Sequence, residues 1–447
     1  MAARNRRFTL AAVTFPLLFL AMSAMARAAT ITVDTTSAGH VAGKCTLEDA
    51  VKSANNQATP SGSSCTAGSS DNDTIEFSVT GTIAIAATLN ITDAQLAIMG
   101  FAGAPGITIS GGNATQIVTV GATNLTLENL TLADGFVGAP PTAFGGAIYE
   151  DLTNLEIENC TFSDNTAGGA GGAGAGGAIF MNSGTVTIIN STFANNAAPS
   201  GPIEMPVAGD GGAIFNDTGT LTTTNTTFSG NEAGIGAVIS ILSVFMHPAV
   251  TSMRSTILAN SKGGGGNCDT SFGTVTDDGY NISDDNSCGF SGTSVNHSTT
   301  LHLDPAGLAS NGGPTQTIAL EPNSQAIDFI PVADCTDQSS PTPLPVTTDQ
   351  RGYPRPDPGN PDFCDAGAFE LQTMPFVLAP NSERLQIARS STPYSDQVNM
   401  AFTFTENGFP SCDAGDNAFN GFTVLLRSGR CEALDDASLE LMLEPWV

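Results

Sequence analysis

Four segments of the chain repeat one pattern of apolar, threonine and asparagine residues at a spacing of about 30 residues. The copies lie at residues 155–165, 186–196, 221–231 and 250–260, with a weaker copy at 125–135. Phe162, Phe193 and Phe228 take equivalent places, 31 and then 35 residues apart. A Gly-Gly-Ala-Ile run precedes three copies, at 145–148, 176–179 and 211–214. A period of this length predicts a solenoid, in which each repeat packs only against its neighbours.

The residue types inside these copies select a parallel β-helix among the solenoids. Short runs of Thr, Ile, Val and Phe are split by Asn and Gly, which is typical of short strands and turns. The copies lack the 3.6-residue apolar period that helical repeats require. We therefore predict an all-β fold, a right-handed parallel β-helix of the pectate-lyase-like kind. The handedness follows from the rule that crossovers between parallel strands are right-handed.

Coils stacked about 4.8 Å apart place equivalent side chains in ladders. Inside the coil we expect one ladder of Ile148, Ile179 and Ile214 and another of Phe162, Phe193 and Phe228. At the bends we expect a ladder of Asn159, Asn190 and Asn225 and a second of Asn165, Asn196, Asn231 and Asn260. Asn suits a sharp bend because it tolerates left-handed backbone geometry and bonds its own backbone.

Before the solenoid, the chain opens with the features of a secretory signal peptide. Arg4, Arg6 and Arg7 precede an apolar run at 8–22, and small residues follow. An uncleaved membrane anchor is the alternative, but the run is shorter than the roughly 20 residues needed to span a bilayer. We predict a signal peptide at 1–28, an N-terminal cap region at 29–80, the β-helix at 81–310, a C-terminal module at 311–372 and a small β-rich unit at 373–447.

An open solenoid end exposes unpaired strand edges and needs a cap. Residues 46–55 read as a short amphipathic helix, with Thr46 as N-cap. Leu47, Ala50, Val51 and Ala54 share one face of this helix. We predict that it covers the N-terminal end of the coil.

Eight of the nine cysteines fall in pairs that are close in sequence. We expect disulfides between Cys45 and Cys65, Cys268 and Cys288, Cys335 and Cys364, and Cys412 and Cys431, although sequence alone leaves other connectivities open. Cys160 is left over inside a repeat, where a buried thiol acting as a small hydrophobe is expected. Disulfides of this kind belong to secreted proteins.

The chain is strongly acidic, with 14 Lys and Arg against 43 Asp and Glu. A formal charge of −29 repels nucleic acids and anionic lipid surfaces, so we expect neither as a partner. Apart from the signal peptide, no segment is long and apolar enough to cross a membrane. The expected location is outside the cell or on its surface, and the expected partner is an extracellular glycan or protein.

The paired Gly-Gly-Ala-Ile and Phe-x-x-Asn motifs resemble the repeats of the chlamydial polymorphic outer-membrane proteins. Three spaced pairs carry this resemblance, the Phe-x-x-Asn runs lying at 162–165, 193–196 and 228–231. It implies a β-helical adhesin that an autotransporter barrel displays. This chain departs from that pattern, because the roughly 75 residues after 372 are too few for a transmembrane barrel of strands with about 10 residues each.

The flanks of the repeats resemble secreted bacterial β-helix proteins that open with a Cys-Ser-Leu-Arg-Glu-Ala motif. Here the run at 45–50 reads Cys-Thr-Leu-Glu-Asp-Ala, so Glu48 replaces the arginine and any role of that arginine is not carried over. The far flank is similar to the C-terminal module called choice-of-anchor Q, in its runs at 279–289, 304–305, 311–317, 326–328, 349–352 and 364–370. The resemblance covers residues 30–371 and implies a surface-exposed protein.

The sequence offers acids but no clear catalytic set. A lyase acting on uronates needs a base and cations, yet Arg254 and Lys262 are the only Lys or Arg between residues 53 and 350. Glycoside hydrolysis needs two nearby carboxylates. The acids near the repeats are Glu150, Asp151, Asp217, Glu156, Glu158 and Asp164. Solvated faces and bends explain them more simply, so we assign no catalytic, cofactor or metal-binding residue.

Calcium is the one cofactor that the sequence leaves open. Asp277, Asp278, Asp284 and Asp285 are closely spaced, as are Asp71 and Asp73. Neither stretch follows the twelve-residue EF-hand loop, and such runs are usually ordinary turns.

We therefore predict an adhesin-like β-helix scaffold that binds glycan or protein, with a polysaccharide-degrading hydrolase or lyase as the alternative. A cluster of acids on one outer face, in a groove with aromatic platforms, would favour the enzyme. A uniform Asn, Thr and Ser face without a cleft would favour the scaffold.

Overall fold

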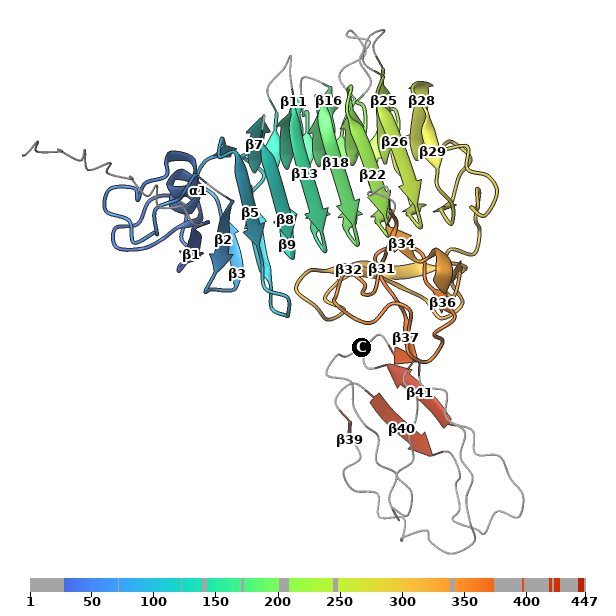
Figure 1. Cartoon of the computed structure of the whole chain (residues 1–447). Helices are drawn as coiled ribbons and strands as arrows, with labels where there is room; N and C mark the ends of the chain where they lie inside the picture. Colours follow the sequence, from blue (N-terminus) through green and yellow to red (C-terminus); the bar gives the residue numbers. More distant parts are fainter. Residues whose placement is uncertain are drawn as a thin grey trace, which may run out of the picture.

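The computed structural model describes residues 28–70, 72–121, 123–138, 143–169, 173–200, 209–243, 248–337 and 342–373, together with short strands beyond residue 373. Apart from its last residue, the predicted signal peptide lies outside this part. The described chain coils into a parallel β-helix with three long sheets (Figure 1). Strands that are neighbours in a sheet come from successive coils, as the repeats predict.

Sheet A has nine parallel strands and forms the face seen in Figure 1. In sheet order they are β1 (Thr30–Val33), β2 (Asp73–Phe77), β5 (Gln95–Met99), β8 (Asn124–Glu128), β13 (Thr153–Glu158), β18 (Gly184–Ile189), β22 (Thr220–Thr224), β26 (Val250–Arg254) and β29 (Val275–Asp277). In β13 the buried Thr153, Leu155 and Ile157 alternate with exposed residues. Such alternation arises where one face of a strand covers a core and the other meets solvent.

Two further long sheets complete the coil. Sheet B contains β3 (Gly81–Ala84), β6 (Ile107–Ser110), β9 (Leu130–Ala133), β14 (Thr161–Ser163), β19 (Thr192–Ala194), β23 (Thr227–Ser229), β27 (Ile257–Ala259) and β30 (Ile282–Ser283). Sheet C contains β4 (Leu89–Ile91), β7 (Val118–Gly121), β12 (Ile148–Asp151), β17 (Ile179–Met181), β21 (Ile214–Asn216), β25 (Ile239–Leu242) and β28 (Cys268–Phe272).

Short parallel strands lie between sheets B and C in the middle coils. One small sheet joins β10 (Phe136–Val137), β15 (Thr166–Ala167), β20 (Ala197–Ala198) and β24 (Glu232–Ala233), and another joins β11 (Ala143–Phe144) and β16 (Gly174–Ala175). The chain varies in length here, so insertions leave the three long sheets in register.

Stacked apolar side chains fill the coil. Phe162, Phe193 and Phe228 lie in register on β14, β19 and β23, with ring centroids 4.6 and 4.9 Å apart. Ile148, Ile179 and Ile214 form a second ladder in sheet C, which Ile239 continues. All of these side chains are buried, and burial of each stabilises the fold by about 1.5–3 kcal/mol.

Asparagine forms two ladders at the bends around sheet B. Asn159, Asn190 and Asn225 have φ values of 55°, 46° and 48°, so each adopts the left-handed conformation that turns the chain from sheet A to sheet B. Asn165, Asn196 and Asn231 form the second ladder. The side-chain Nδ2 of Asn165 donates to Oδ1 of Asn196 at 2.9 Å, and that of Asn196 donates to Oδ1 of Asn231 at 3.0 Å.

The fourth repeat is shifted by one residue from the alignment that we predicted. The strand register pairs Leu221 with Thr251 and Phe228 with Leu258, where we expected Val250 and Ile257. Asn260 therefore does not extend the Asn165 ladder; its φ of 57° matches that of Asn195 instead. Because side chains alternate along a strand, the one-residue shift turns Met253 into the core.

The N-terminal helix forms where it was predicted. Helix α1 (Leu47–Asn56) starts at Thr46, whose hydroxyl accepts a 3.2 Å hydrogen bond from the backbone N–H of Asp49. Its apolar residues Leu47, Ala50, Val51 and Ala54 are buried, and the helix packs against β1 and β4. Strands β1 and β2, which precede and follow this helix in the sequence, are the first two strands of sheet A.

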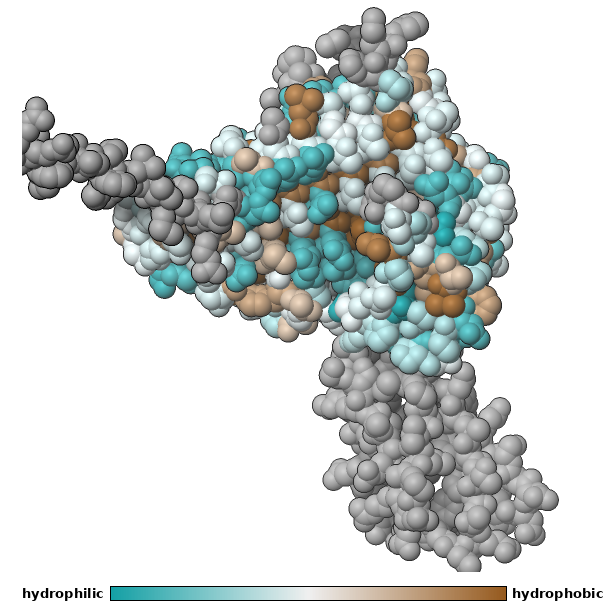
Figure 2. Space-filling view, in the orientation of Figure 1, coloured by the Kyte–Doolittle hydropathy of each residue, from teal (hydrophilic) through white to brown (hydrophobic). Residues whose placement is uncertain are grey.

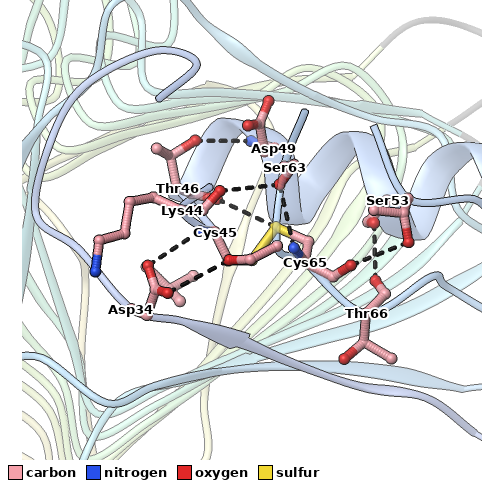
Figure 3. Close-up of a disulfide and its surroundings, with 12 residues drawn as sticks. Asp34, Lys44, Cys45, Thr46, Asp49, Ser53, Ser63, Cys65 and Thr66 are labelled. Atoms are coloured by element: carbon pink, nitrogen blue, oxygen red, sulfur yellow. Dashed lines mark hydrogen bonds between the residues drawn. A yellow bond between two sulfur atoms is a disulfide. The ribbon is translucent and has the colours of Figure 1, made fainter. Parts of the chain in front are cut away.

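A disulfide between Cys45 and Cys65 ties the start of α1 to the loop that follows it (Figure 3). Asp34 reinforces the link: its carboxylate accepts from the backbone N–H of Cys45 at 3.0 Å, and its own N–H donates to the Cys45 carbonyl at 3.0 Å. The hydroxyl of Ser53, on α1, donates to the carbonyl of Thr66 at 2.8 Å. Closing a loop of this size contributes about 3 kcal/mol in the chain-entropy model.

Two more of the predicted disulfides are present, between Cys268 and Cys288 and between Cys335 and Cys364. The pair of Cys412 and Cys431 lies outside the described residues. Cys160 is a buried free thiol, and burial raises its pKa to about 12. A thiol that stays protonated in an apolar core acts as a small hydrophobe rather than a nucleophile.

A C-terminal module covers the outer face of sheet B, below the ends of the sheet A strands in Figure 1. It contains three antiparallel pairs: β31 (Leu303–Ala309) with β32 (Thr317–Leu320), β33 (Ile330–Pro331) with β36 (Phe363–Cys364), and β34 (Thr336–Asp337) with β35 (Leu344–Pro345). A short 3₁₀ helix, η1 (Val332–Asp334), lies between β33 and β34.

A ladder of threonines on sheet B holds this module. The hydroxyl of Thr161 donates to the carbonyl of Gln316, and that of Thr192 donates to Oε1 of Gln350, both at 2.6 Å. The hydroxyl of Thr227 accepts from the N–H of Ala368 at 2.9 Å. Three successive coils therefore each bind the module directly.

The module is locked internally by buried ion pairs from two of its motifs. Arg351 contacts Asp349 at 2.7 Å, and Arg355 contacts Glu370 at 3.1 Å. The Arg351 guanidinium also lies 3.7 Å above the ring of Phe369. The runs at 349–352 and 364–370 also bond each other, because the N–H of Glu370 donates to the Asp349 carboxylate at 3.0 Å and Arg351 donates to the carbonyl of Glu370 at 2.5 Å.

Beyond the module the structure describes only short strands. Strand β37 (Gln372–Thr373) pairs with β38 (Asp396–Gln397), and β39 (Ala418–Phe419), β40 (Phe422–Leu426) and β41 (Leu441–Pro445) form an antiparallel sheet. Strand β40 falls within the small β-rich unit that we predicted at 373–447.

Truncating the middle phenylalanine tests the ladder. We expect Phe193→Ala to lower the free energy of unfolding by about 3–5 kcal/mol, because it removes a buried ring between two stacked neighbours. Thr185→Ala, at an exposed position of sheet A, is the control and should change it by less than about 0.5 kcal/mol. Urea denaturation measures the free energy of unfolding of both variants. Equal decreases would contradict a stabilising role for the phenylalanine ladder.

Candidate functional site

The outer face of sheet A carries a groove of about 580 Å³. It runs across the outward side chains of β2, β5, β8, β13 and β18, and in Figure 2 this face is hollowed, with hydrophobic colour on the floor and hydrophilic colour around it. Four rung spacings make it roughly 20 Å long. Its lining consists of Asn72, Asp73, Thr74, Gln95, Leu96, Ala97, Asn124, Leu125, Thr126, Asn154, Leu155, Glu156, Thr185 and Thr187.

Amide and hydroxyl side chains form two rows along the groove. Gln95, Asn124, Asn154 and Thr185 occupy one register position on four successive strands. The Nδ2 of Asn154 donates to Oδ1 of Asn124 at 2.8 Å. In the neighbouring row, Thr126 donates to Oε2 of Glu156 at 3.4 Å. The rows offer donors and acceptors at a fixed spacing of about 4.8 Å.

Three carboxylates share this outer face. Glu156 lines the groove, and Glu158 lies two residues further along the same strand, on the same face. Glu128 is directly opposite Glu158 on the neighbouring strand. Burial raises the pKa of Glu158, and the charges of Glu128, Asp337 and Glu156 raise it further. We considered Glu156 and Glu158 from the sequence without assigning them a role, and the structure places them close to Glu128.

Sequence reasoning missed two members of this acidic group. Glu128 holds the position in the weak first repeat that Glu158 holds in the next, so aligning the two copies would have paired them. Asp337 belongs to the C-terminal module and accepts a 3.4 Å hydrogen bond from the hydroxyl of Thr224 on sheet A. Its approach depends on how the module docks, which no local pattern encodes.

The arginines of the described chain are engaged elsewhere. Arg254 ends the same outer row of sheet A, but it donates to the carbonyls of Asp278 and Asp334 at 2.5 and 2.7 Å. This contact joins the coil to the module and gives Arg254 a structural role. Arg351 and Arg355 are buried in the module, and none of the five ion pairs among the described residues involves a carboxylate of the groove.

The other acids that we considered from the sequence lie apart from the groove. Glu150 is inside the coil, fully buried, and its Oε2 accepts from the N–H of Thr153 at 3.2 Å. Asp151 and Asp217 lie at the end of sheet C, where Asp151 accepts from Nδ2 of Asn182 at 2.8 Å. Asp164 is exposed at a bend with φ of 57°. The structure does not assemble these acids into one site.

A second set of aromatic side chains forms a separate stack on the outer face of sheet C. Phe180 stacks on Phe144, Tyr149 and Phe215, with ring centroids 4.2, 5.6 and 5.2 Å apart. Phe180 and Phe215 are buried, so most of the stack serves as a second small core. None of the groove's lining residues is aromatic. The outer face of sheet A thus combines the acids expected of an enzyme with the polar rows expected of a scaffold.

The aspartates considered for calcium take part in hydrogen bonds within their loops. Asp277 accepts from the hydroxyl of Ser294 at 2.6 Å and from the N–H of Ser291 at 2.7 Å. Burial acts to raise the pKa of Asp285, but hydrogen bonds from Ser287, Asn267 and Ser283 outweigh it and hold that pKa below its ordinary value. Asp73 accepts from the backbone N–H groups of Ala29 and Ser69. Asp71 lies outside the described residues.

A cation at these loops would have to displace those hydrogen bonds. Among the residues that the structure describes, no group of three or more His, Cys, Asp or Glu side chains is arranged to hold a metal ion. Calcium binding therefore stays an open expectation of the sequence.

Comparison with known families agrees with this architecture. The family model described as a right handed beta helix region matches residues 104–282, which run from the coil of β6 to that of β30. With the long parallel sheets, this match confirms the predicted all-β, right-handed parallel β-helix. Searches of curated proteins and of solved structures found no match. Within the described residues, no helix is long and apolar enough to cross a membrane.

The buried Glu150 predicts a pH-dependent stability. Burial raises its pKa from 4.5 to about 8, so its contribution is fully present below pH 4.5 and is lost as the pH rises to about 8. Glu150→Gln stays neutral throughout. We expect the melting temperature of this variant, relative to the parent, to rise across that window and then level off. Thermal melts at a series of pH values measure this, with the exposed Glu232→Gln as control. A pH-independent difference would contradict it.

Proposed function

We propose that this protein is an extracellular glycan-binding scaffold and that the sheet A groove holds the sugar chain. The observation that carries this proposal is the row of Gln95, Asn124, Asn154 and Thr185 along the groove. Amides both donate and accept hydrogen bonds, which is what vicinal sugar hydroxyls require. A rigid sheet presents these groups without an ordering cost on binding, which favours affinity.

The repeat of the groove also suits a polymer. Successive rungs are about 4.8 Å apart, comparable to the length of one pyranose unit in an extended chain. A sugar chain lying across the strands would therefore meet an equivalent set of side chains at each unit. Between the polar rows the floor is the backbone of Leu96, Leu125 and Leu155, whose side chains are buried in the core.

Three features support a place outside the cell. The three disulfides of the described chain form in oxidising compartments. The N-terminal sequence has the pattern of a secretory signal. The resemblance to secreted bacterial β-helix proteins with a choice-of-anchor Q module and to polymorphic outer-membrane repeats adds to this, and it supports an adhesin-like role at the cell surface.

A glycoside hydrolase is the second candidate, favoured by the carboxylates on the same face. Glu128 and Glu158 are opposite each other on adjacent rungs, about 4.8 Å apart at the backbone, close to the separation of about 5–5.5 Å that retaining glycosidases use. The raised pKa of Glu158 suits a general acid, and Glu128 is the partner carboxylate. The binding role stands ahead, because the groove has polar rows but no aromatic platform.

Removing one amide tests the binding role. We expect Asn154→Ala to weaken binding of an oligosaccharide by about fivefold to tenfold, since one amide and its contact with Asn124 are lost. Thr220→Ala, in the same row beyond the groove, is the matched control. Glycan-array binding identifies the sugar and calorimetry measures its affinity. Equal affinities for both variants would remove the groove as the binding site.

Reducing-end release from neutral and acidic polysaccharides separates the two candidates. If the hydrolase reading holds, Glu158→Gln should reduce release by at least about a hundredfold, because the general acid is lost. Asp164→Asn, an exposed acid at a distant bend, should leave release unchanged. Binding without any release supports the scaffold.

A further inference from the structure

The sheet A groove is lined by uncharged donors and acceptors, and its exposed charge is negative. Glu156 is the exposed ionisable side chain of the lining, since Asp73 is buried and holds backbone N–H groups. Glu128 and Glu158 continue the negative charge beside it. A ligand that fills this groove meets the amide row on one side and Glu156 on the other, with Glu128 and Glu158 just beyond the lining.

The three neighbouring carboxylates lower the stability of the fold. Like charges directly opposite each other on neighbouring strands are destabilising, and Glu128 and Glu158 are such a pair. Glu156 adds a third charge on the same strand face. The amide Nδ2 of Asn129 donates to Oε1 of Glu128 at 3.1 Å, but no Lys or Arg of the described chain forms an ion pair with any of the three.

Within the part of the chain that the structure describes, the lysines and Arg254 are placed away from the three glutamates. Lys44 and Lys52 belong to the N-terminal cap, where Lys52 lies 3.7 Å from Asp49. Lys262 donates to Asn195 at a bend of sheet B, and Arg254 is held by the C-terminal module. The positive charge that would balance the three glutamates must therefore come from outside these residues.

We propose that the groove selects a glycan that carries ammonium groups, such as a chain of unacetylated glucosamine units. In this arrangement the sugar hydroxyls bond the amide row, and the ammonium groups face Glu128, Glu156 and Glu158. The inference rests on the proposed glycan-binding function and narrows its ligand. Polyuronates are disfavoured, because their carboxylates would meet these three glutamates.

A glycan fits this site better than a basic peptide does. The amide row repeats one donor–acceptor set at every rung, which matches a polymer of identical hydroxyl-bearing units. An extended peptide repeats its side chains on one face every two residues, at a longer spacing than one rung. Strands β5, β8 and β13 are central in sheet A, so they offer no free edge for a peptide strand.

The experiment compares four probes with the full mature chain by calorimetry at low salt. They are a glucosamine oligomer, its fully N-acetylated counterpart, an oligogalacturonate and an oligolysine of similar length. We expect the glucosamine oligomer to bind about tenfold more tightly than its acetylated counterpart, with the gap shrinking as salt is added. The double variant Glu156→Gln/Glu158→Gln should close the gap, and Glu232→Gln, an exposed glutamate on β24, should preserve it.

The outcomes separate this inference from the function on which it rests. If the acetylated oligomer binds as tightly as the glucosamine oligomer, or the oligogalacturonate binds better, the charge selectivity is wrong while glycan binding stands. If no glycan binds to the folded protein, both fail. If oligolysine binds as tightly and loses as much in the double variant, the site is one for basic peptides and the inference is overturned. Circular dichroism of each variant checks its fold.

Discussion

The register between successive coils is the constraint on which the rest of this structure depends. Each strand of sheet A bonds its equivalent in the next coil, so a residue type that recurs in the sequence becomes a column in space. Phe162, Phe193 and Phe228 stay aligned even though one coil is four residues longer than the one before it. The difference in length falls between β20 and β21, so the register of the long sheets and the core stay intact.

The same register that stacks the core also shapes the outer face. Rows of Asn and Thr arise because equivalent positions of successive repeats carry similar polar residues, and the 2.8 Å contact of Asn154 with Asn124 is one result. The same register also forces Glu128 to lie directly beside Glu158, and the two like charges repel each other. Solvent screens this pair in part, so the fold tolerates it, and a cationic ligand would relieve it.

The C-terminal module is held in shape by buried ion pairs rather than by repeated strands. Its buried pairs, Arg351 with Asp349 and Arg355 with Glu370, cost desolvation and return little net stability. Their hydrogen bonds fix the geometry of Gln350, whose amide reaches the hydroxyls of Thr161 and Thr192 on the coil. The module thereby covers sheet B and leaves the groove on sheet A as the open face of the middle coils.

The sequence by itself determined the β-helix, the capping helix, the three described disulfides and the ladders, because each depends on local patterns or on a repeat that stacks on itself. It aligned Val250 with Leu221, one residue away from the observed pairing of Leu221 with Thr251, because alternation along a short strand allows a one-residue shift that only neighbouring strands resolve. It named Glu156 and Glu158 among several acids, without assigning them a role, and could not group them with Asp337. Only the tertiary structure decides that grouping. Asp337 comes close to Glu158, more than 170 residues earlier in the chain, because the C-terminal module docks on the coil.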